Sequence, residues 1–268
     1  MKKNLIKNMT AAIAALFIAL LALPQTALAQ SKEAYVVEDG STLTFYYDAN
    51  KATHTTGTVY GINDKRKDDT TSPAWVGASD DPNERITKVV FDSSFKDYRP
   101  ATTNSWFFFC SKLTEFEGMS NLITDQVTDM SHMFFWCSSL TSLDVSNFNT
   151  KKVTAMTSMF FNCPDLTTIY CNDDWNKGVV AESKGMFYDC PKLKGAATYD
   201  ANKTDVSMAN PSSGYFTKKD PSGIDAATVD TPAARRGIYT LNGVRLNTSP
   251  DNLPAGIYVI DGRKVVKR

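Results

Sequence analysis

The residues best suited to chemistry in this sequence are cysteines and histidines. Cys137 lies five residues after His132, so a cysteine nucleophile with a histidine base is the sharpest catalytic hypothesis. Four cysteines, however, recur at intervals of 27, 26 and 27 residues, namely Cys110, Cys137, Cys163 and Cys190. The positions equivalent to His132 hold Ser105, Ser158 and Gly185. Because the cysteine column repeats and the histidine does not, we predict no catalytic residue and expect the chain not to be an enzyme.

No metal site or cofactor is predicted either. Zinc sites use closely spaced cysteines and histidines, and the chain has no Cys-x-x-Cys and only two histidines, of which His54 has no evident partner. The polar stretch 63–84 could form a calcium loop, but the ordered spacing of a calcium-binding loop is missing. Its acidic residues are Asp64, Asp68, Asp69, Asp80, Asp81 and Glu84. We favour a solvated loop.

The periodic cysteines can be read in two ways. In an exported protein Cys110 could pair with Cys137, and Cys163 with Cys190. Cysteine is also among the most buried residue types when unpaired, and stacked side chains point in parallel rather than at one another. We favour buried free thiols, with Cys171 as a fifth thiol of the core, and leave the pairing open.

Composition and the N-terminus indicate an exported globular protein. Lys and Arg together number 29, equal to Asp and Glu, which argues against a nucleic-acid partner because such proteins carry a clustered positive excess. A hydrophobic content of 42% is too high for a disordered chain. Three early lysines, an apolar run over 11–23 and Ala27-Leu28-Ala29 predict a signal peptide, 1–29, with no membrane span after its cleavage.

The cysteine period belongs to a longer repeat. Aromatic residues stand three and two places before each cysteine, and leucine stands three places after it. Apolar alternation over 140–145 predicts a short strand, and helical spacing over 153–163 predicts a helix that returns on the opposite side. We therefore expect an α/β fold, a solenoid of about five strand–helix coils over 86–218.

The run 127–150 resembles the leucine-rich repeats of BspA-like surface proteins. Its Met-Phe-x-x-Cys-x-x-Leu-Thr signature is intact at Met133 and at Met159, and the resemblance covers roughly 86–216. It implies a secreted or cell-surface bacterial protein of the Bacteroidetes type, associated with the outer membrane and often with adhesion to host molecules. It implies no defined ligand.

The flanking segments are predicted to be β-rich. Residues 30–85 read as an N-terminal cap with a hairpin over 34–48 that turns at Asp39-Gly40. A linker, 219–236, precedes two hairpins in 237–268 with turns at Asn242-Gly243 and Asp261-Gly262. This tail resembles C-terminal sorting segments of exported Bacteroidetes proteins, so the export or anchoring machinery is a candidate partner.

We expect the protein to bind an extracellular protein, peptide or glycan through one of two surfaces. One is an aromatic pair, Phe109 and Trp136, unless the N-terminal cap covers it. The other is the outer face of the strands, with Glu115, Glu117, Ser142, Asp144, Thr168 and Tyr170. A passive structural role at the cell surface is the alternative, and an unrecognised secreted hydrolase is the third.

Overall fold

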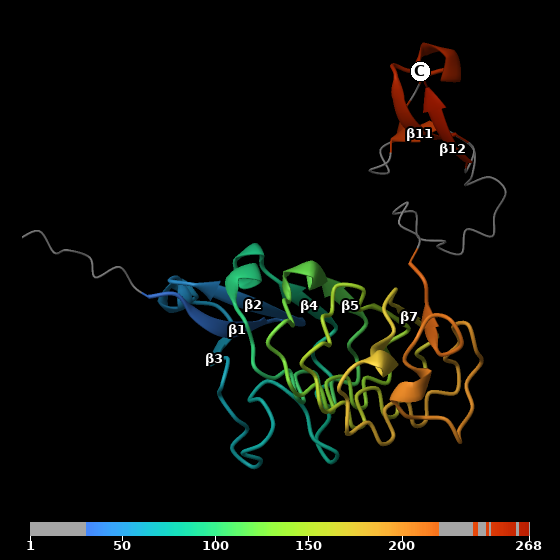
Figure 1. Cartoon of the computed structure of the whole chain (residues 1–268). Helices are drawn as coiled ribbons and strands as arrows, with labels where there is room; N and C mark the ends of the chain where they lie inside the picture. Colours follow the sequence, from blue (N-terminus) through green and yellow to red (C-terminus); the bar gives the residue numbers. More distant parts are fainter. Residues whose placement is uncertain (1–30, 220–237, 241–244, 247, 261–262, 268) are drawn as a thin grey trace, which may run out of the picture.

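The computed structural model describes residues 31–219, 238–240, 245–246, 248–260 and 263–267 (Figure 1). The signal peptide and almost all of the linker predicted above lie outside these residues. The described part is rich in strands, and its helices are 3-10 helices of three to five residues. None of these helices is long and apolar enough to cross a membrane.

The N-terminal hairpin forms as predicted and joins the repeats through one sheet. Strand β1 (Glu33–Asp39) pairs antiparallel with β2 (Thr42–Asp48) and with β3 (Thr58–Gly61). The turn uses Gly40 at a φ of 58°, a conformation that glycine adopts without strain. Strand β2 then runs parallel to β4 (Lys88–Phe91), so the hairpin covers an edge that the first repeat would otherwise leave open.

The strands of successive repeats pair in parallel but form two small sheets. Strand β4 pairs with β5 (Glu115–Glu117), which completes the sheet order β3-β1-β2-β4-β5. The second sheet contains β6 (Ser142–Asp144), β7 (Thr168–Tyr170) and β8 (Phe216–Thr217) in that order. The short helices are η1 (Lys51–Thr53), η2 (Ser93–Asp97), η3 (Met119–Asn121), η4 (Trp175–Lys177), η5 (Val206–Met208) and η6 (Pro250–Asn252).

The predicted strand–helix solenoid is wrong, because the described repeats contain no returning helix. The segment before each periodic cysteine is a run of tight turns. Each run contains two residues with positive φ. Those five places before the cysteine are Ser105, His132, Ser158 and Gly185, and those directly before it are Phe109, Trp136, Asn162 and Asp189. An α-helix needs a φ near −63° at every position, so these residues exclude it.

The hydrogen bonds of the second repeat show what replaces the helix. The N–H groups of Phe135 and Cys137 donate to carbonyls three residues earlier, at 3.1 and 3.3 Å. The N–H groups of Phe134 and Trp136, which alternate with them, donate to Met159 and Phe161 of the next repeat, both at 2.9 Å. Half of the backbone donors therefore close local turns and half tie neighbouring repeats together.

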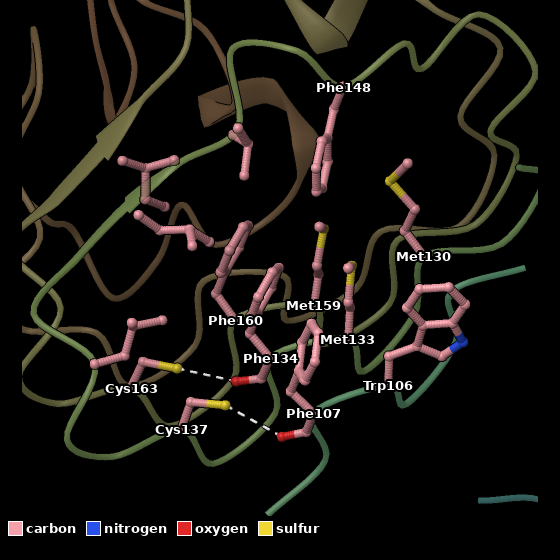
Figure 2. Packing of buried hydrophobic residues seen from close by; sticks show 14 of the residues in the cluster. Trp106, Phe107, Met130, Met133, Phe134, Cys137, Phe148, Met159, Phe160 and Cys163 are labelled. Carbon is pink, nitrogen blue, oxygen red and sulfur yellow. Dashed lines mark hydrogen bonds between the residues drawn. The ribbon is translucent and has the colours of Figure 1, made fainter. Parts of the chain in front are cut away.

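These turns stack the aromatic side chains of the core in register. Phe107, Phe134, Phe160 and Phe187 are all fully buried and form a continuous column. Their ring centroids lie 5.5, 5.4 and 5.6 Å apart in that order. Figure 2 shows the first three rings lying over one another, with methionines beside them. Repetition of the same side chain at the same place thus gives neighbouring repeats complementary surfaces.

The two hairpins predicted in the C-terminal segment pair with each other. The strands β9 (Ile238–Thr240), β10 (Arg245–Leu246), β11 (Gly256–Ile260) and β12 (Arg263–Lys267) form a sheet in the order β10-β9-β11-β12. Pairing of β9 with β11 makes four strands from hairpins that would each be marginal alone. The predicted turns at 242–243 and 261–262 lie outside the described residues.

Candidate functional site

All five cysteines are buried and unpaired, the arrangement favoured above over two disulfides. Cys137 donates its thiol hydrogen to the carbonyl of Phe107 at 3.2 Å, and Cys163 donates to Phe134 at 3.1 Å (Figure 2). Cys190 makes the same bond to Phe160 at 2.9 Å. Each of these three thiols therefore links one repeat to the repeat before it.

Burial also makes the thiols poor nucleophiles. Desolvation raises the pKa of Cys110 to about 12 and that of Cys171 to about 11, and it raises the pKa values of Cys137 and Cys163 as well. A thiol must ionise to attack, so these groups are inert in the folded chain. The ring of His132 lies against Phe108 and Phe135, while the sulfur of Cys137 points to a carbonyl. The structure does not bring them together.

Raised thiol pKa values predict a loss of stability in alkali. Unfolded cysteine ionises near pH 8.5, whereas burial keeps the thiols of Cys110, Cys137, Cys163 and Cys171 neutral to a higher pH. The neutral thiols therefore make their full contribution to the free energy of unfolding below pH 8.5. That contribution is lost as the pH rises toward the pKa values of the folded state. In reducing buffer, we expect the urea midpoint to fall steadily from pH 8 to 10.5. Cys137→Ser keeps a donor for Phe107 and should make the fall shallower; an identical slope would contradict this assignment.

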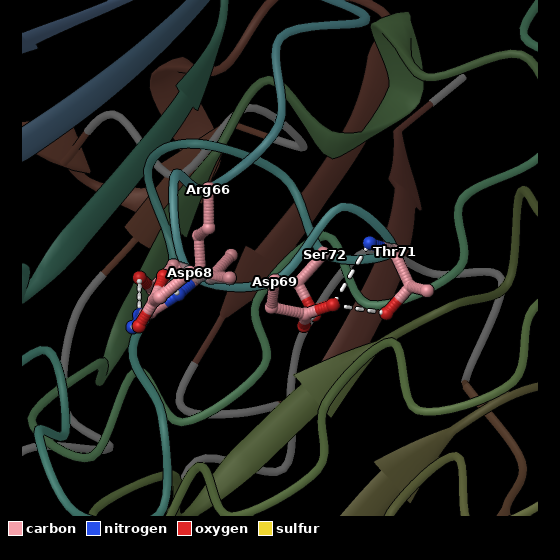
Figure 3. A network of polar contacts seen from close by, with 6 residues as sticks. Arg66, Asp68, Asp69, Thr71 and Ser72 are labelled. Atoms are coloured by element: carbon pink, nitrogen blue, oxygen red, sulfur yellow. Dashed lines mark hydrogen bonds and ion pairs between the residues drawn. The ribbon is translucent and has the colours of Figure 1, made fainter.

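Five of the six acidic side chains of the stretch 63–84 are exposed, as expected for a solvated loop, and hydrogen bonds within the loop order it. Arg66 donates to the two carboxylate oxygens of Asp68, at 2.6 and 3.0 Å, and Asp69 accepts from Thr71 and Ser72. Figure 3 shows these residues together in the loop. The bonds from Ser72 and Thr71 lower the pKa of Asp69 to about 2. Within the described ranges, no three histidine, cysteine or acidic side chains converge as a metal site.

The outer strand face carries the six predicted side chains on three strands, with Glu115 and Glu117 on β5, Ser142 and Asp144 on β6, and Thr168 and Tyr170 on β7. Its charges are partly paired within the chain. Lys88 of β4 contacts both glutamates at 2.8 Å, and Lys219 pairs with Asp144. The face is therefore less acidic than the sequence suggests, and β5 and β6 belong to different sheets.

The predicted pair of exposed aromatics is only half present. Phe109 is 5% exposed because the N-terminal segment covers it: its carbonyl accepts from Asn83 N–H at 2.9 Å. The ring of Trp136 packs against that of Phe109, with a centroid distance of 5.0 Å and an interplanar angle of 39°, and Trp136 is 36% exposed. With its amide oriented to satisfy both neighbours, Asn162 accepts from Trp136 Nε1 at 2.7 Å and donates to Asp189 at 2.8 Å. Of the residues directly before the four cysteines, Phe109 is therefore covered, Trp136 is exposed, and Asn162 and Asp189 are polar.

A second surface is formed by the aromatic residues two places before each periodic cysteine. We call Phe108, Phe135, Phe161 and Tyr188 the aromatic column. Consecutive ring centroids lie 4.9, 4.8 and 4.9 Å apart, with interplanar angles of 27°, 10° and 18°. The three phenylalanines are half-buried, and Tyr188 is 50% exposed. The sequence shows that an aromatic residue recurs two places before each cysteine, but it does not show that these side chains are partly exposed.

His54 also gains partners that its sequence context did not reveal. Its Nε2 lies 2.9 Å from the hydroxyl of Tyr35, which donates to Asp48 at 2.8 Å. Burial and Asp48 both raise the pKa of Tyr35 well above its usual value. Tyr35 is fully buried and His54 and Asp48 are partly buried, so these hydrogen bonds tie the N-terminal strands to the segment that follows them.

Comparison with known proteins adds one similarity. No curated protein and no solved structure matches the chain. Residues 102–221, which contain all four periodic cysteines, match the model of a family described as a Mycoplasma protein of unknown function, DUF285.

Proposed function

We propose that the protein is exported and binds a protein or peptide partner through the aromatic column and the adjoining Trp136. The observation that carries the proposal is the presence of an accessible ring at the same place in four successive repeats, ending in Tyr188. A core needs buried rings, and the fully buried column of Phe107 and its equivalents already supplies them. Aromatic side chains that remain accessible are typical anchors of protein interfaces.

The stacking geometry favours a protein or peptide over a sugar at this surface. Sugars bind aromatic side chains by lying on a ring face, but the faces within the aromatic column are covered by neighbouring rings. What the column offers is a row of ring edges about 4.9 Å apart. Aliphatic and aromatic side chains of an extended peptide could pack along that row.

Export and a surface location belong to the same proposal. They rest on the signal peptide expected at 1–29, on the resemblance to BspA-like surface proteins and on the C-terminal tail, 237–268, which resembles sorting segments of exported proteins. Retention would depend on the segment 237–268, whose described strands form a small separate sheet. Deleting 237–268 is expected to change localisation while leaving the repeats folded; normal surface display of the truncated protein would contradict the role given to this segment.

Binding is tested by measuring the association of the purified protein with a panel of immobilised extracellular matrix proteins. We expect saturable binding to at least one of them, and a loss of about tenfold or more in affinity for the double variant Trp136→Ala/Tyr188→Ser. The matched control is Val179→Ala, which removes an apolar side chain that is 60% exposed but lies outside the aromatic column.

Two outcomes would overturn the proposal. Equal losses in the double variant and in Val179→Ala would show that general surface apolarity, not the aromatic column, drives association. The absence of saturable binding to any member of the panel would instead favour a passive structural role at the cell surface.

A further inference from the structure

A second site, distinct from the aromatic column, lies where the turns after β6 and β7 meet the segment 211–218. These segments enclose a concavity of about 680 Å³, here called the polar pocket. Its lining includes Asn149, Lys151, Asn172, Asp173, Lys177 and Lys218. We propose that the polar pocket binds a short acidic oligosaccharide, a sugar chain that carries carboxylate or sulfate groups.

The charges of the pocket favour an anionic group on the ligand. Lys177 pairs with Asp174 at 3.3 Å, but Lys151 and Lys218 have no ion-pair partner among the described residues. Both lysines are exposed. Hydrogen bonds from an ammonium to a carboxylate or sulfate are stronger than those between neutral groups. Two uncommitted lysines at one concavity are therefore an available site for an acidic group.

The amides of the pocket are held in place by the backbone. Asn149 Oδ1 accepts from the N–H of Lys151 at 3.1 Å, and Asn172 Oδ1 accepts from the N–H of Lys219 at 2.9 Å. Each bond engages the oxygen and leaves the amide nitrogen as a donor. Donors that are fixed before binding cost less entropy to use.

A sugar chain fits this set of groups better than a phosphate-rich ligand. Asp173 is exposed and its carboxylate has no hydrogen-bond partner among the described residues, so it can accept from a hydroxyl but would repel a polyanion. A sugar acid presents both hydroxyls and an isolated negative group. The pocket volume also lies in the range usual for small-ligand sites.

Another concavity among the described residues is a weaker candidate because its arginines are already engaged. It lies beside the loop 64–85 and measures about 560 Å³. Arg66 donates to Asp68 and to the carbonyl of Val76, and Arg85 pairs with Glu38. A ligand there would have to displace these bonds, whereas the two lysines of the polar pocket are uncommitted.

Calorimetric titration of the purified protein with three tetrasaccharides tests the proposal. The probes are a hyaluronan fragment with carboxylates, a heparin fragment with sulfates and carboxylates, and the neutral cellotetraose. We expect saturable binding of the hyaluronan fragment, whose carboxylates are separated along the chain, weaker binding of the heparin fragment, whose denser charge Asp173 would repel, and no binding of cellotetraose. Lys151→Ala/Lys218→Ala should weaken the binding of hyaluronan about tenfold or more, since each lost partner is a charged one.

Two further variants separate a built site from general charge attraction. Lys112→Ala/Lys184→Ala removes the same charge from exposed lysines outside the pocket and should leave the affinity nearly unchanged. Asn149→Asp keeps an oxygen for the N–H of Lys151, replaces a donor by a negative charge, and should weaken binding as strongly as the lysine pair.

Equal losses in the two lysine pairs, equal binding of cellotetraose, or no saturable binding of either acidic probe would overturn the proposal. The aromatic column lies outside the pocket, so Trp136→Ala/Tyr188→Ser should bind the acidic probe like the unaltered protein. The pocket and the column can therefore fail independently.

Discussion

Replacing Phe134 with alanine is expected to lower the free energy of unfolding by about 3–5 kcal/mol, the usual cost of removing a fully buried phenylalanine. Phe134 is 0% exposed and lies between Phe107 and Phe160, with ring centroids 5.5 and 5.4 Å away. Its ring also meets the edge of Phe116 at 5.8 Å. Alanine would open a cavity that the rings above and below cannot close, because hydrogen-bonded turns fix the distance between repeats.

The neighbouring Phe135 gives a matched control. It belongs to the aromatic column and is only half-buried, so Phe135→Ala should cost on the order of 1–2 kcal/mol. Urea unfolding followed by fluorescence measures both variants. Equal losses would mean that the two columns are buried alike, and the distinction between core and binding surface would be lost.

Gly118→Ala is expected to destabilise the protein by about 2–5 kcal/mol. Gly118 has a φ of 66°, a conformation that costs other residues roughly 1–2 kcal/mol. A Cβ at this position would also lie 2.2 Å from the carbonyl oxygen of Phe91, a backbone atom of the neighbouring strand β4. Relief of such a clash requires the backbone to shift, at a further cost of about 1–3 kcal/mol.

The variant Gly40→Ala separates the conformational cost of a positive φ from the cost of the steric clash. Its φ is 58°, but a Cβ there would meet no atom within 4 Å. Gly40→Ala should therefore show only the conformational cost, about 1–2 kcal/mol. If thermal or urea unfolding gives the same loss for both variants, the close approach of Gly118 to β4 is not a constraint on the fold.

The strands and the N-terminal hairpin could be predicted from the sequence because their signals are local. In β6 and β7 the central residues Leu143 and Ile169 are buried, while the residues on either side of them are more exposed, as the apolar alternation indicated. The turn at Asp39-Gly40 likewise follows from residues that favour positive φ.

The returning helix was mispredicted because its apolar spacing is ambiguous. Residues three places apart share a face in a helix, and they also share a face in a chain of three-residue turns such as that over Met156–Cys163. What decides is the φ of Ser158 and of Asn162, which are 52° and 53°. Histidine, asparagine and aspartate adopt that conformation more often than most residues, whereas bulky residues such as Phe109 and Trp136 rarely do, so their residue types give no signal of it. Bonds to the next repeat maintain it there.

The candidate surfaces failed in part because they depend on contacts between distant segments. Phe109 is covered through a bond from Asn83, 26 positions earlier, and Asp144 is paired with Lys219, 75 positions later. No local pattern reports such contacts. The accessible aromatic column was hidden for a related reason, since constancy of a residue type does not distinguish a core column from a half-exposed one.

Backbone NMR of the isotopically labelled protein over residues 127–137 tests most directly that the repeats are built from stacked turns. Chemical shifts and amide–Hα couplings report φ at each residue, and an α-helix requires the same φ throughout. The structure predicts positive φ at His132 and Trp136, with the residues between them at negative φ. Uninterrupted helical values from Val127 to Cys137 would contradict it, and with it the exposure of the aromatic column.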